Sequence, residues 1–478
     1  MCSTNRSFVS TMSSLRVSGG TVVTPEGQRR ADVRVEDGRV VTVESPGKGG
    51  RVDEEIDATG KLVFPGFIDP HVHSRDPGFP EKEDFAHSTQ AAAAGGITTV
   101  LEMPNAIPPV ADAATFDERA NHHGRVAFVD FGLWGLALGV QNLDQLAPLL
   151  AAGVVGFKLF WGYALHRETK QLVYNLAEYA PADLIMPPGN GEVLRLCQEI
   201  ARLGALLAAH CEDRGLLEEA QKQLGHPIQS YADLLGARPE VSEAASIALA
   251  AEFARATGCR VHVVHMSSAR GVDLVRQARQ SGVPLSAETC PQYLTLSDQD
   301  YARLGGMMKV YPPVRHLDDQ EALWQGVEDG VISSVGSDHA PHTVEQKRLP
   351  LGEQPAGNVG VETLGPLMVD AMLRGRASAE RLASVLSGGT ARLYGLYPQK
   401  GAIQPGSDAD LTIVDPSATT TIRNERLHSK QKISPWHGQQ CRGAITMTVL
   451  RGRVIMRDGE PVGEVSGRLI RPAQGRAS

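Results

Sequence analysis

The chain has 478 residues, 42% of them hydrophobic, which is enough to bury one large core and a smaller one. Its formal net charge of -8 is mild for this length, and no basic stripe with interleaved aromatic residues occurs, so we expect no nucleic-acid partner. No apolar run approaches the roughly 20 residues of a membrane-spanning helix, so we expect no membrane insertion.

The amino-terminal segment, MCSTNRSFVSTMSS, is polar and lacks the apolar core of a signal peptide. The six cysteines, at positions 2, 197, 211, 259, 290 and 441, are widely spaced and form no CxxC pair. We therefore expect a reduced protein in the cytoplasm, whose cysteines serve as small hydrophobic side chains.

Both ends of the chain predict strands. From Leu15 to about Glu44 apolar and polar residues alternate, and Asp37-Gly38 interrupts the run as a turn signal, which is typical of antiparallel strands joined by hairpins. The same pattern returns at Asp408 to Asp415 and at Thr448 to Val462. Two β-rich ends that flank a different middle predict one small β-sandwich assembled from both termini.

The middle of the chain alternates strand-like and helix-like segments, which predicts βαβ units and a parallel sheet. Helical patterns cover stretches such as Gly191 to Leu203 and Ser242 to Thr257. Eight segments are strand candidates: Leu62 to Ile68, Thr98 to Glu102, Val126 to Leu133, Val154 to Phe160, Ala205 to Ala209, Arg260 to Val264, Pro284 to Ala287, and Val331 to Gly336. Eight such units in roughly 330 residues fit an α/β fold of the TIM (β/α)8 barrel type, with insertions.

The predicted organisation is therefore a TIM barrel with a small β-sandwich built from both termini. We assign residues 1–61 to the amino-terminal part of the sandwich and residues 62–398 to the barrel domain. Residues 399–478 are expected to form the carboxyl-terminal part of the sandwich and a tail.

Residue types that bind metals occur near the ends of several predicted strands. The run LVFPGFIDPHVH ends in His71 and His73, which point to the same side because alternate residues of a strand do. A His-x-His pair alone is weak evidence. However, barrel active sites lie where the carboxyl ends of the strands meet, and four more candidates follow this rule: Lys158, His210, His265 and Asp338. Together they predict a metal site on that face.

Four histidines and one carboxylate can hold two divalent ions, with zinc as the expected metal, if a further group bridges them. A lysine desolvated beside two cations would be neutral and could add carbon dioxide, so that carboxylated Lys158 would be the bridge. The alternative is a lysine whose stem packs in the barrel and whose head group forms a salt bridge. Residue types alone do not decide between these two interpretations.

A water bound between two such ions would ionise near pH ~7. Asp338 could bind one ion, take the proton from that water and deliver it to the leaving nitrogen. The predicted chemistry is the metal-assisted hydrolysis of an amide or ester. A phosphoester is less favoured, because no phosphate-binding basic cluster or Gly-rich loop stands out.

Motifs along nearly the whole chain resemble the cyclic amidohydrolases of the amidohydrolase superfamily, which include hydantoinases, dihydropyrimidinases, allantoinases and dihydroorotases. They are PGFIDPHVHSRDPG, AAAAGGITTVLEMPN, VVGFKLF, AAHCED, HVVHMSS, AETCPQYL, YPPVR, SDHAPH and QPGSDADL. The resemblance implies a dinuclear metal centre on the six residues named above, a carboxylated Lys158, and assembly into homodimers or homotetramers. It also implies His265 rather than His262 as the ligand in HVVH, places His339 behind the ligands and leaves His342 open.

The residues that would select the substrate ring support two different interpretations, a hydantoinase-like enzyme and a dihydroorotase-like one. Tyr163, five residues after Lys158, matches the tyrosine with which hydantoinases and dihydropyrimidinases stabilise the developing oxyanion, although a tyrosine after a strand is often a packing residue. Arg75 and Asn105 resemble instead the pair with which dihydroorotases bind the substrate carboxylate, a task that suits the guanidinium fork.

We interpret the chain as a hydantoinase- or allantoinase-like enzyme that opens a small cyclic ureide or imide, with a preference for rings that carry a polar or anionic substituent. Dihydroorotase is the main alternative. A non-catalytic scaffold protein of the same superfamily is a minor one, because such proteins characteristically lose ligands that this chain retains. Loops 77–83 and 345–357, rich in Pro, Gly and charge, are expected to border the pocket.

Overall fold

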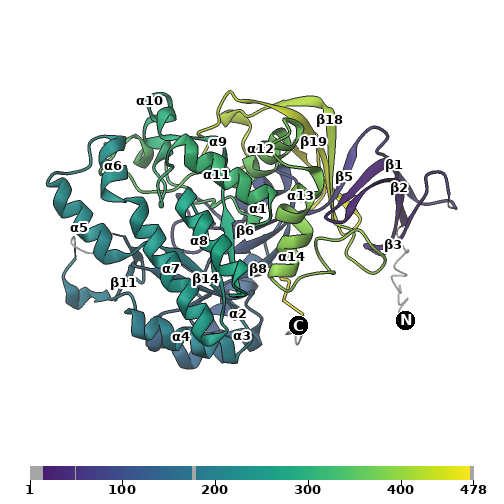
Figure 1. Ribbon diagram of the computed structural model, residues 1–478. Coiled ribbons are helices and arrows are strands. Elements are labelled where there is room, and N and C mark those ends of the chain that lie inside the picture. The colour runs from purple at the N-terminus through teal and green to yellow at the C-terminus, as the bar shows by residue number, and fades with distance from the viewer. Residues whose placement is uncertain (1–13, 49, 175–178, 474–478) are drawn as a thin grey trace, which may run out of the picture.

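The computed structural model describes residues 14–48, 50–174 and 179–473. The expectations about the first 13 residues, including Cys2, concern residues outside this range. Figure 1 shows a large part built of strands and helices, beside which a sheet made from both ends of the chain is placed. In the described part of the chain, every helix is too short or too polar to span a membrane.

Eight parallel strands form the centre of the large part: β6 (Phe67–Val72), β7 (Ile97–Glu102), β8 (Asp130–Leu133), β10 (Phe157–Trp161), β14 (Leu206–Cys211), β15 (Arg260–Val263), β16 (Leu285–Thr289) and β17 (Ile332–Val335). They pair in two runs, β6-β7-β8 and β10-β14-β15-β16-β17, and the two-residue β9 (Gly135–Leu136) extends the second run. Between the runs, the backbone N of Val155 donates to the carbonyl of Leu133 at 2.9 Å, and Val72 pairs with His339 just after β17. The strands thus close into a barrel, and the predicted fold class is confirmed.

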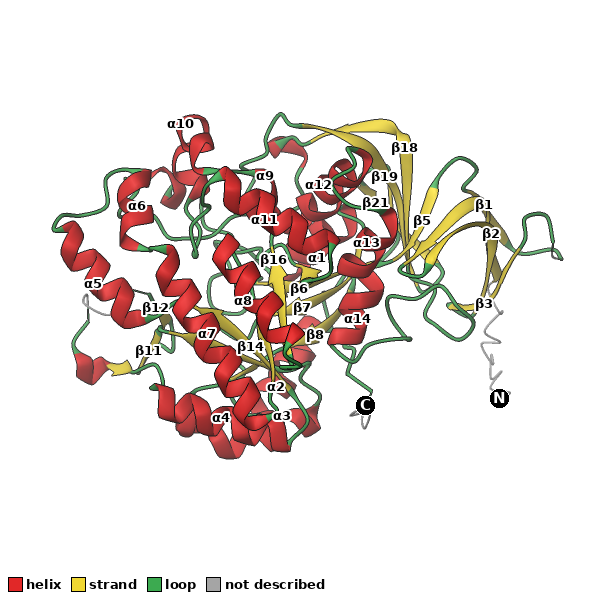
Figure 2. Ribbon diagram, viewed as in Figure 1, coloured by secondary structure: helices red, strands yellow, loops and turns green. Residues whose placement is uncertain are grey.

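Helices cover the outside of this barrel (Figure 2). Every residue of β6, β7, β10 and β14 is buried, as expected for parallel strands that have helices on one side and packed side chains on the other. These helices include α1 (Phe85–Ala94), α2 (Ala113–His123), α3 (Leu146–Ala152), α4 (Asn190–Arg202), α7 (Glu240–Thr257), α8 (Ala269–Gln280), α11 (Leu317–Glu328) and α12 (Val361–Leu373). The predicted helices agree with α4 and α7 to within two residues.

Further elements lie in the segments that follow the barrel strands. After β10 a small sheet contains β11 (Ala164–His166), β12 (Leu172–Val173) and β13 (Leu184–Ile185), and after β14 come α5 (Arg214–Leu224) and α6 (Tyr231–Ala237). The connection after β16 holds α9 (Pro291–Thr295) and α10 (Tyr301–Leu304), and the one after α12 holds α13 (Ala379–Ala383) and α14 (Gly389–Leu393).

The second sheet has nine strands in the order β21-β20-β19-β18-β5-β1-β2-β3, with β4 paired to β1. Its members are β1 (Ser14–Thr24), β2 (Gly27–Glu36), β3 (Arg39–Glu44), β4 (Glu54–Asp57), β5 (Leu62–Pro65), β18 (Leu411–Thr421), β19 (Gln440–Leu450), β20 (Arg453–Arg457) and β21 (Glu460–Pro461). Val33 of β2 and Leu411 of β18 belong to one buried core, so this continuous sheet curls around its own apolar side chains. Strands from both termini therefore fold together, as predicted.

The predicted strand Leu62 to Ile68 was wrong as a single element, because the run is two strands in two different sheets. Residues of β5 pair with β1 and β18, whereas β6 begins the barrel. Between them, Gly66 passes so close to Thr98 that a Cβ at this position would lie 2.2 Å from the threonine Oγ1. The apolar run LVFPGFI conceals this break, since both halves are buried.

Candidate metal centre

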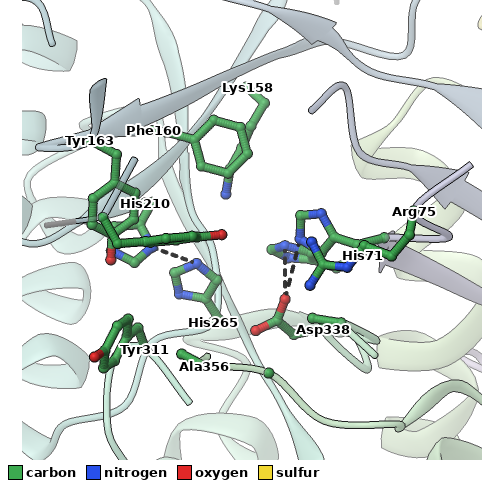
Figure 3. A pocket seen from close by; sticks show the side chains of 14 residues that line it. His71, Arg75, Lys158, Phe160, Tyr163, His210, His265, Tyr311, Asp338 and Ala356 are labelled. Carbon is green, nitrogen blue, oxygen red and sulfur yellow. Dashed lines mark hydrogen bonds and ion pairs between the residues drawn. The ribbon is translucent and has the colours of Figure 1, made fainter. Parts of the chain in front are cut away.

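A small pocket opens at the face of the barrel where the carboxyl ends of the strands meet (Figure 3). It encloses about 40 Å³. All six predicted metal-binding residues line it, together with Arg75 and Tyr163. The remaining wall is formed by Phe160, Tyr174, Tyr311, Ala340, Ala356 and Gly357.

Secondary structure places these residues slightly differently from the prediction. His71, Lys158 and His210 lie within β6, β10 and β14 rather than at or after the strand ends, and Lys158 is the second residue of its strand. His265 and Asp338 follow β15 and β17, as expected. His265, Asp338 and Arg75 all have φ values in the left-handed region, at 41°, 47° and 62°. Such backbone conformations are costly for these residue types and concentrate at functional sites.

The first half of the centre contains His71, His73 and Asp338. Nε2 of His71 lies 3.3 Å from Oδ1 of Asp338, and Nε2 of His73 lies 3.5 Å from the same oxygen. One potential ligand atom from each of the three residues lies within 4.8 Å of the others. The three side chains therefore converge on one point.

The second half contains His210 and His265, whose Nδ1 and Nε2 atoms are 3.0 Å apart. The rings of His71 and His265 have centroids 5.3 Å apart, so the two halves are adjacent. Burial lowers the pKa of His73 to about 4 and also lowers the pKa of His210 and His265. The imidazoles of His73, His210 and His265 are therefore neutral at physiological pH, which is the form that binds metals.

Partner groups fix the hydrogen positions on three of these rings. Nδ1 of His71 lies 2.8 Å from Oε1 of Glu288, and Nε2 of His210 lies 2.9 Å from Oε2 of Glu212. Nδ1 of His73 lies 2.8 Å from Oδ1 of Asn105. Because carbonyl and carboxylate oxygens only accept, we assign the hydrogen to the facing ring nitrogen in each case. The other nitrogen then carries a lone pair that points into the centre.

Glu288 is ionised in this arrangement. Burial alone would raise its pKa, but the imidazoles of His71 and His262 outweigh burial and lower the pKa of Glu288 to about 2. With Nδ1 of His71 donating to Glu288, its lone-pair nitrogen Nε2 faces the Asp338 carboxylate, so two acceptors lie 3.3 Å apart. Either a proton or a metal ion between these two atoms satisfies both of them. The residues present therefore fit a metal ion at this point.

Lys158 is fully buried, and among the described residues its Nζ has no hydrogen-bond partner and no ion pair. Burial lowers the pKa of Lys158 to about 8, an effect that the carboxylates of Asp338 and Glu288 partly oppose. A lysine held by a salt bridge, the alternative that the sequence left open, is not what the structure contains. A substantial fraction of a lysine with this pKa is neutral at physiological pH, and a neutral amine can react with carbon dioxide.

The two proposed substrate-binding residues are separated. Arg75 lines the pocket, where its Nε donates to the carbonyl of Pro341 at 3.3 Å and its Nη2 lies 3.3 Å from Nε2 of His342. Asn105 is not part of the pocket wall and is bonded to His73 instead. Of the loops expected at the pocket, 345–357 contributes Ala356 and Gly357, whereas 77–83 contributes no lining residue.

The other histidines lie outside the pocket wall. His262 is bonded to Ser286, with Nδ1 2.8 Å from the hydroxyl, and its Nε2 lies 3.2 Å from the hydroxyl of Tyr394. His339 accepts from the backbone N of Gly360 at 3.2 Å, and its own carbonyl accepts from the backbone N of His73 at 2.8 Å.

Sequence reasoning missed the two carboxylates that orient the ligands. Glu212 directly follows β14 and Glu288 lies within β16, so both occupy the strand-end positions from which ligand candidates were drawn. The motifs AAHCED and AETCPQYL contain them. The missing signal was that a metal-binding imidazole needs an acceptor for its second nitrogen.

The sequence profile described as the amidohydrolase family matches residues 62–455. The chain is similar to an allantoinase of Rubrobacter xylanophilus, with 39% identity over 96% of this chain and 97% of the relative. It is also similar to an L-hydantoinase of Paenarthrobacter aurescens, with 34% identity over 92% and 93% of the two chains.

Among solved structures, the L-hydantoinase from Arthrobacter aurescens superposes with a TM-score of 0.89 at 33% identity, covering 96% of this chain and all of that one (100%). A dihydropyrimidinase from Brevibacillus agri superposes with a TM-score of 0.86 at 26% identity, covering 97% and 100%. The chain therefore belongs to the amidohydrolase family. It is accordingly a hydrolase of carbon–nitrogen bonds, and the predicted family and enzyme class are confirmed.

Proposed function

We propose that this protein is a metal-dependent cyclic amidohydrolase that opens the ring of a cyclic ureide of the allantoin or hydantoin type. The observation that carries the proposal is the convergence of four imidazoles, a carboxylate and a buried lysine amine in one pocket; among the described residues this amine has no hydrogen-bond partner. The relatives named allantoinase and L-hydantoinase, which match nearly the whole chain, support the choice of ring.

Two divalent ions, with zinc as the expected metal, would be held by His71, His73, Lys158, His210, His265 and Asp338, with Lys158 carboxylated at Nζ. When bound, such ions lower the pKa of a coordinated water to about 7 and polarise the scissile carbonyl. The lowered pKa of Lys158 and the absence of any hydrogen-bond or ion-pair partner for its Nζ among the described residues support the carboxylation.

Asp338 is proposed as the residue that moves the proton. Burial alone would raise its pKa, but the imidazoles of His71 and His73 outweigh burial and lower it, so Asp338 is a carboxylate at neutral pH. Its Oδ1 faces both imidazoles. The second oxygen is therefore the atom that would accept a proton from water and donate it to the leaving ring nitrogen.

Tyr163 is proposed as the hydrogen-bond donor to the oxyanion that develops on the attacked carbonyl. Burial raises the pKa of Tyr163 well above its usual range, so the hydroxyl keeps its hydrogen at any physiological pH. Arg75 lines the same pocket and is proposed to bind a polar or anionic substituent of the ring.

Dihydroorotase remains the second candidate because Arg75 lies in the pocket. Asn105 is hydrogen-bonded to His73, so it does not bind a substrate carboxylate together with Arg75, and this favours the cyclic ureide as substrate. Retention of all six metal-binding residue types disfavours a non-catalytic scaffold. We further propose a cytoplasmic enzyme that forms homodimers or homotetramers. The described cysteines are all unpaired and buried, which suits a reducing compartment.

The test is a ring-opening assay after purification with zinc and bicarbonate. The panel would contain allantoin, hydantoin, a 5-substituted hydantoin, dihydrouracil and dihydroorotate, with Lys158→Ala alongside. We expect turnover of allantoin or hydantoins that disappears in the variant. Turnover of dihydroorotate alone would favour the second candidate, and bound metal without turnover of any ring would contradict the proposal.

A further inference from the structure

Arg238 is a buried arginine in the connection between α6 and α7, and it reaches the wall of the candidate active site. It ends α6 as the C-cap residue, and its backbone N donates to the carbonyl of Leu234. The side chain is only 8% exposed. Arg315 holds the backbone of Arg238 in place by donating from Nη1 to its carbonyl at 3.1 Å.

Three side chains surround the Arg238 guanidinium. Its Nη2 donates to the hydroxyl oxygen of Tyr163 at 2.8 Å and forms an ion pair with Oε2 of Glu212 at 3.2 Å. Its flat face covers the ring of Tyr311, with the central carbon 3.5 Å from the ring centroid. A planar guanidinium can donate hydrogen bonds from its edge while its face stacks on an aromatic ring, which a lysine ammonium cannot do.

This geometry decides where the hydrogen of the Tyr163 hydroxyl goes. Because Arg238 donates to the phenol oxygen, the phenol must direct its own hydrogen elsewhere. The acceptor present is Oε2 of Glu212 at 3.3 Å, beyond the usual length of an O–H···O bond. That bond is weak, and Glu212 already receives a second hydrogen bond from His210. Tyr163 can therefore give up the bond to Glu212 at little cost.

We infer that Arg238 is a positioning residue that directs the Tyr163 hydroxyl hydrogen toward the oxyanion formed during ring opening, with Glu212 as its acceptor in the resting enzyme. The inference rests on the proposed function, since it needs a ring carbonyl in the pocket. Arg238 does not touch the substrate in this scheme. Its positive charge beside the phenol also strengthens the hydroxyl as a donor.

The test is a double-mutant cycle between Arg238→Gln and Tyr163→Phe, with kcat and KM measured on the best substrate of the ring panel. Removing one oxyanion donor costs about 10²–10³-fold in kcat, and we expect Tyr163→Phe to fall in this range. Arg238→Gln should lower kcat by about 10-fold or more while KM changes little. Because Arg238 acts through Tyr163, adding Arg238→Gln to Tyr163→Phe should cost less than about 3-fold.

Two controls distinguish an effect on catalysis from a loss of bound metal or of folded structure. Bound metal is measured for every variant, since Glu212 also contacts His210. Arg451→Gln removes another largely buried arginine, which pairs with Asp130 outside the pocket, and should leave kcat unchanged. If Arg238→Gln is poorly folded, Arg238→Ala is assayed with added guanidinium against sodium chloride at equal ionic strength, and only guanidinium should restore kcat.

Independent, multiplicative losses in the double mutant would overturn the inference, as would a loss explained entirely by missing metal. The inference would also be overturned if added guanidinium did not restore kcat of the Arg238→Ala variant. Failure of the proposed function gives a different result, because the wild-type protein would then turn over no ring and no cycle could be measured.

Discussion

The amide oxygen of Asn105 lies 2.8 Å from Nδ1 of His73, so this asparagine holds a candidate metal ligand and does not face the pocket. The ring nitrogen opposite, Nε2, faces Asp338. Asn105 thus accepts a hydrogen bond from Nδ1 of His73, in the same way that Glu288 accepts one from Nδ1 of His71. A residue that orients a ligand changes metal affinity, whereas a residue that binds substrate changes substrate preference.

Replacement of Asn105 by alanine is therefore expected to weaken metal binding by about 10–100-fold, because His73 loses the partner that fixes its tautomer. The measurement is zinc retained after dialysis against a graded series of chelator concentrations. Preference among the rings should stay the same once zinc is saturating. A variant with normal zinc affinity and a raised KM for dihydroorotate would instead assign Asn105 to the substrate.

Arg75→Ala is expected to lower kcat/KM for rings with an anionic or strongly polar substituent by about 10–100-fold, because a charge-assisted hydrogen bond is lost. Unsubstituted hydantoin should be affected far less. The informative quantity is the ratio of the two kcat/KM values, since general damage to the site lowers both equally. An unchanged ratio would show that the Arg75 side chain does not select the substituent.

Reactivation of the metal-free protein should need bicarbonate and should depend on pH. The protonated form of Lys158 cannot add carbon dioxide, and its pKa is lowered to about 8 by burial. At a constant concentration of dissolved carbon dioxide, the rate of reactivation with zinc should therefore rise with pH up to about 8 and then level off, because above this pKa the amine is already neutral. An exposed lysine, with a pKa near 10.4, would keep accelerating to about pH 10.

Two results would count against this mechanism. Reactivation at the same rate in solutions freed of carbon dioxide would exclude carboxylation of Lys158. A rate that still rises well above pH 8 would mean that the buried amine is not the reacting group. The Lys158→Ala variant serves as the control, since zinc and bicarbonate should not restore its activity.

Lys400 joins the barrel to the nine-stranded sheet through a buried ion network. Its Nζ lies 2.5 Å from Asp130 of β8, 2.7 Å from Asp410 and 3.1 Å from Asp408. Lys400→Met leaves these buried carboxylates without their ammonium, so we expect the free energy of unfolding to fall by about 3–5 kcal/mol. Urea denaturation measures the change.

A matched exposed lysine provides the comparison. Lys430 forms a pair with Asp84 at 3.3 Å, and its side chain is 36% exposed. Lys430→Met should cost less than about 1 kcal/mol, since solvent screens such pairs. Equal losses for the two variants would mean that the Lys400 network does not hold the two parts of the molecule together.

The sequence by itself determined the barrel and the set of metal-binding candidates. Alternation of apolar strands and amphipathic helices is a local pattern, and the carboxyl ends of parallel strands must meet on one face. For this reason His71, His73, His210, His265 and Asp338 could be brought together without coordinates. The motifs around them also identified the family before any comparison.

Only the tertiary structure decided which groups support these residues. Asn105 and Glu288 act through contacts with His73 and His71, which lie far from them in the sequence. Arg238 likewise reaches Tyr163 across 75 positions of the chain. The place of β5 in the outer sheet likewise depends on its pairing with β18, in which Leu411 lies opposite Pro65. These two residues are far apart in the sequence. Local patterns report burial and periodicity, but a hydrogen bond between side chains far apart in sequence depends on how the whole barrel packs.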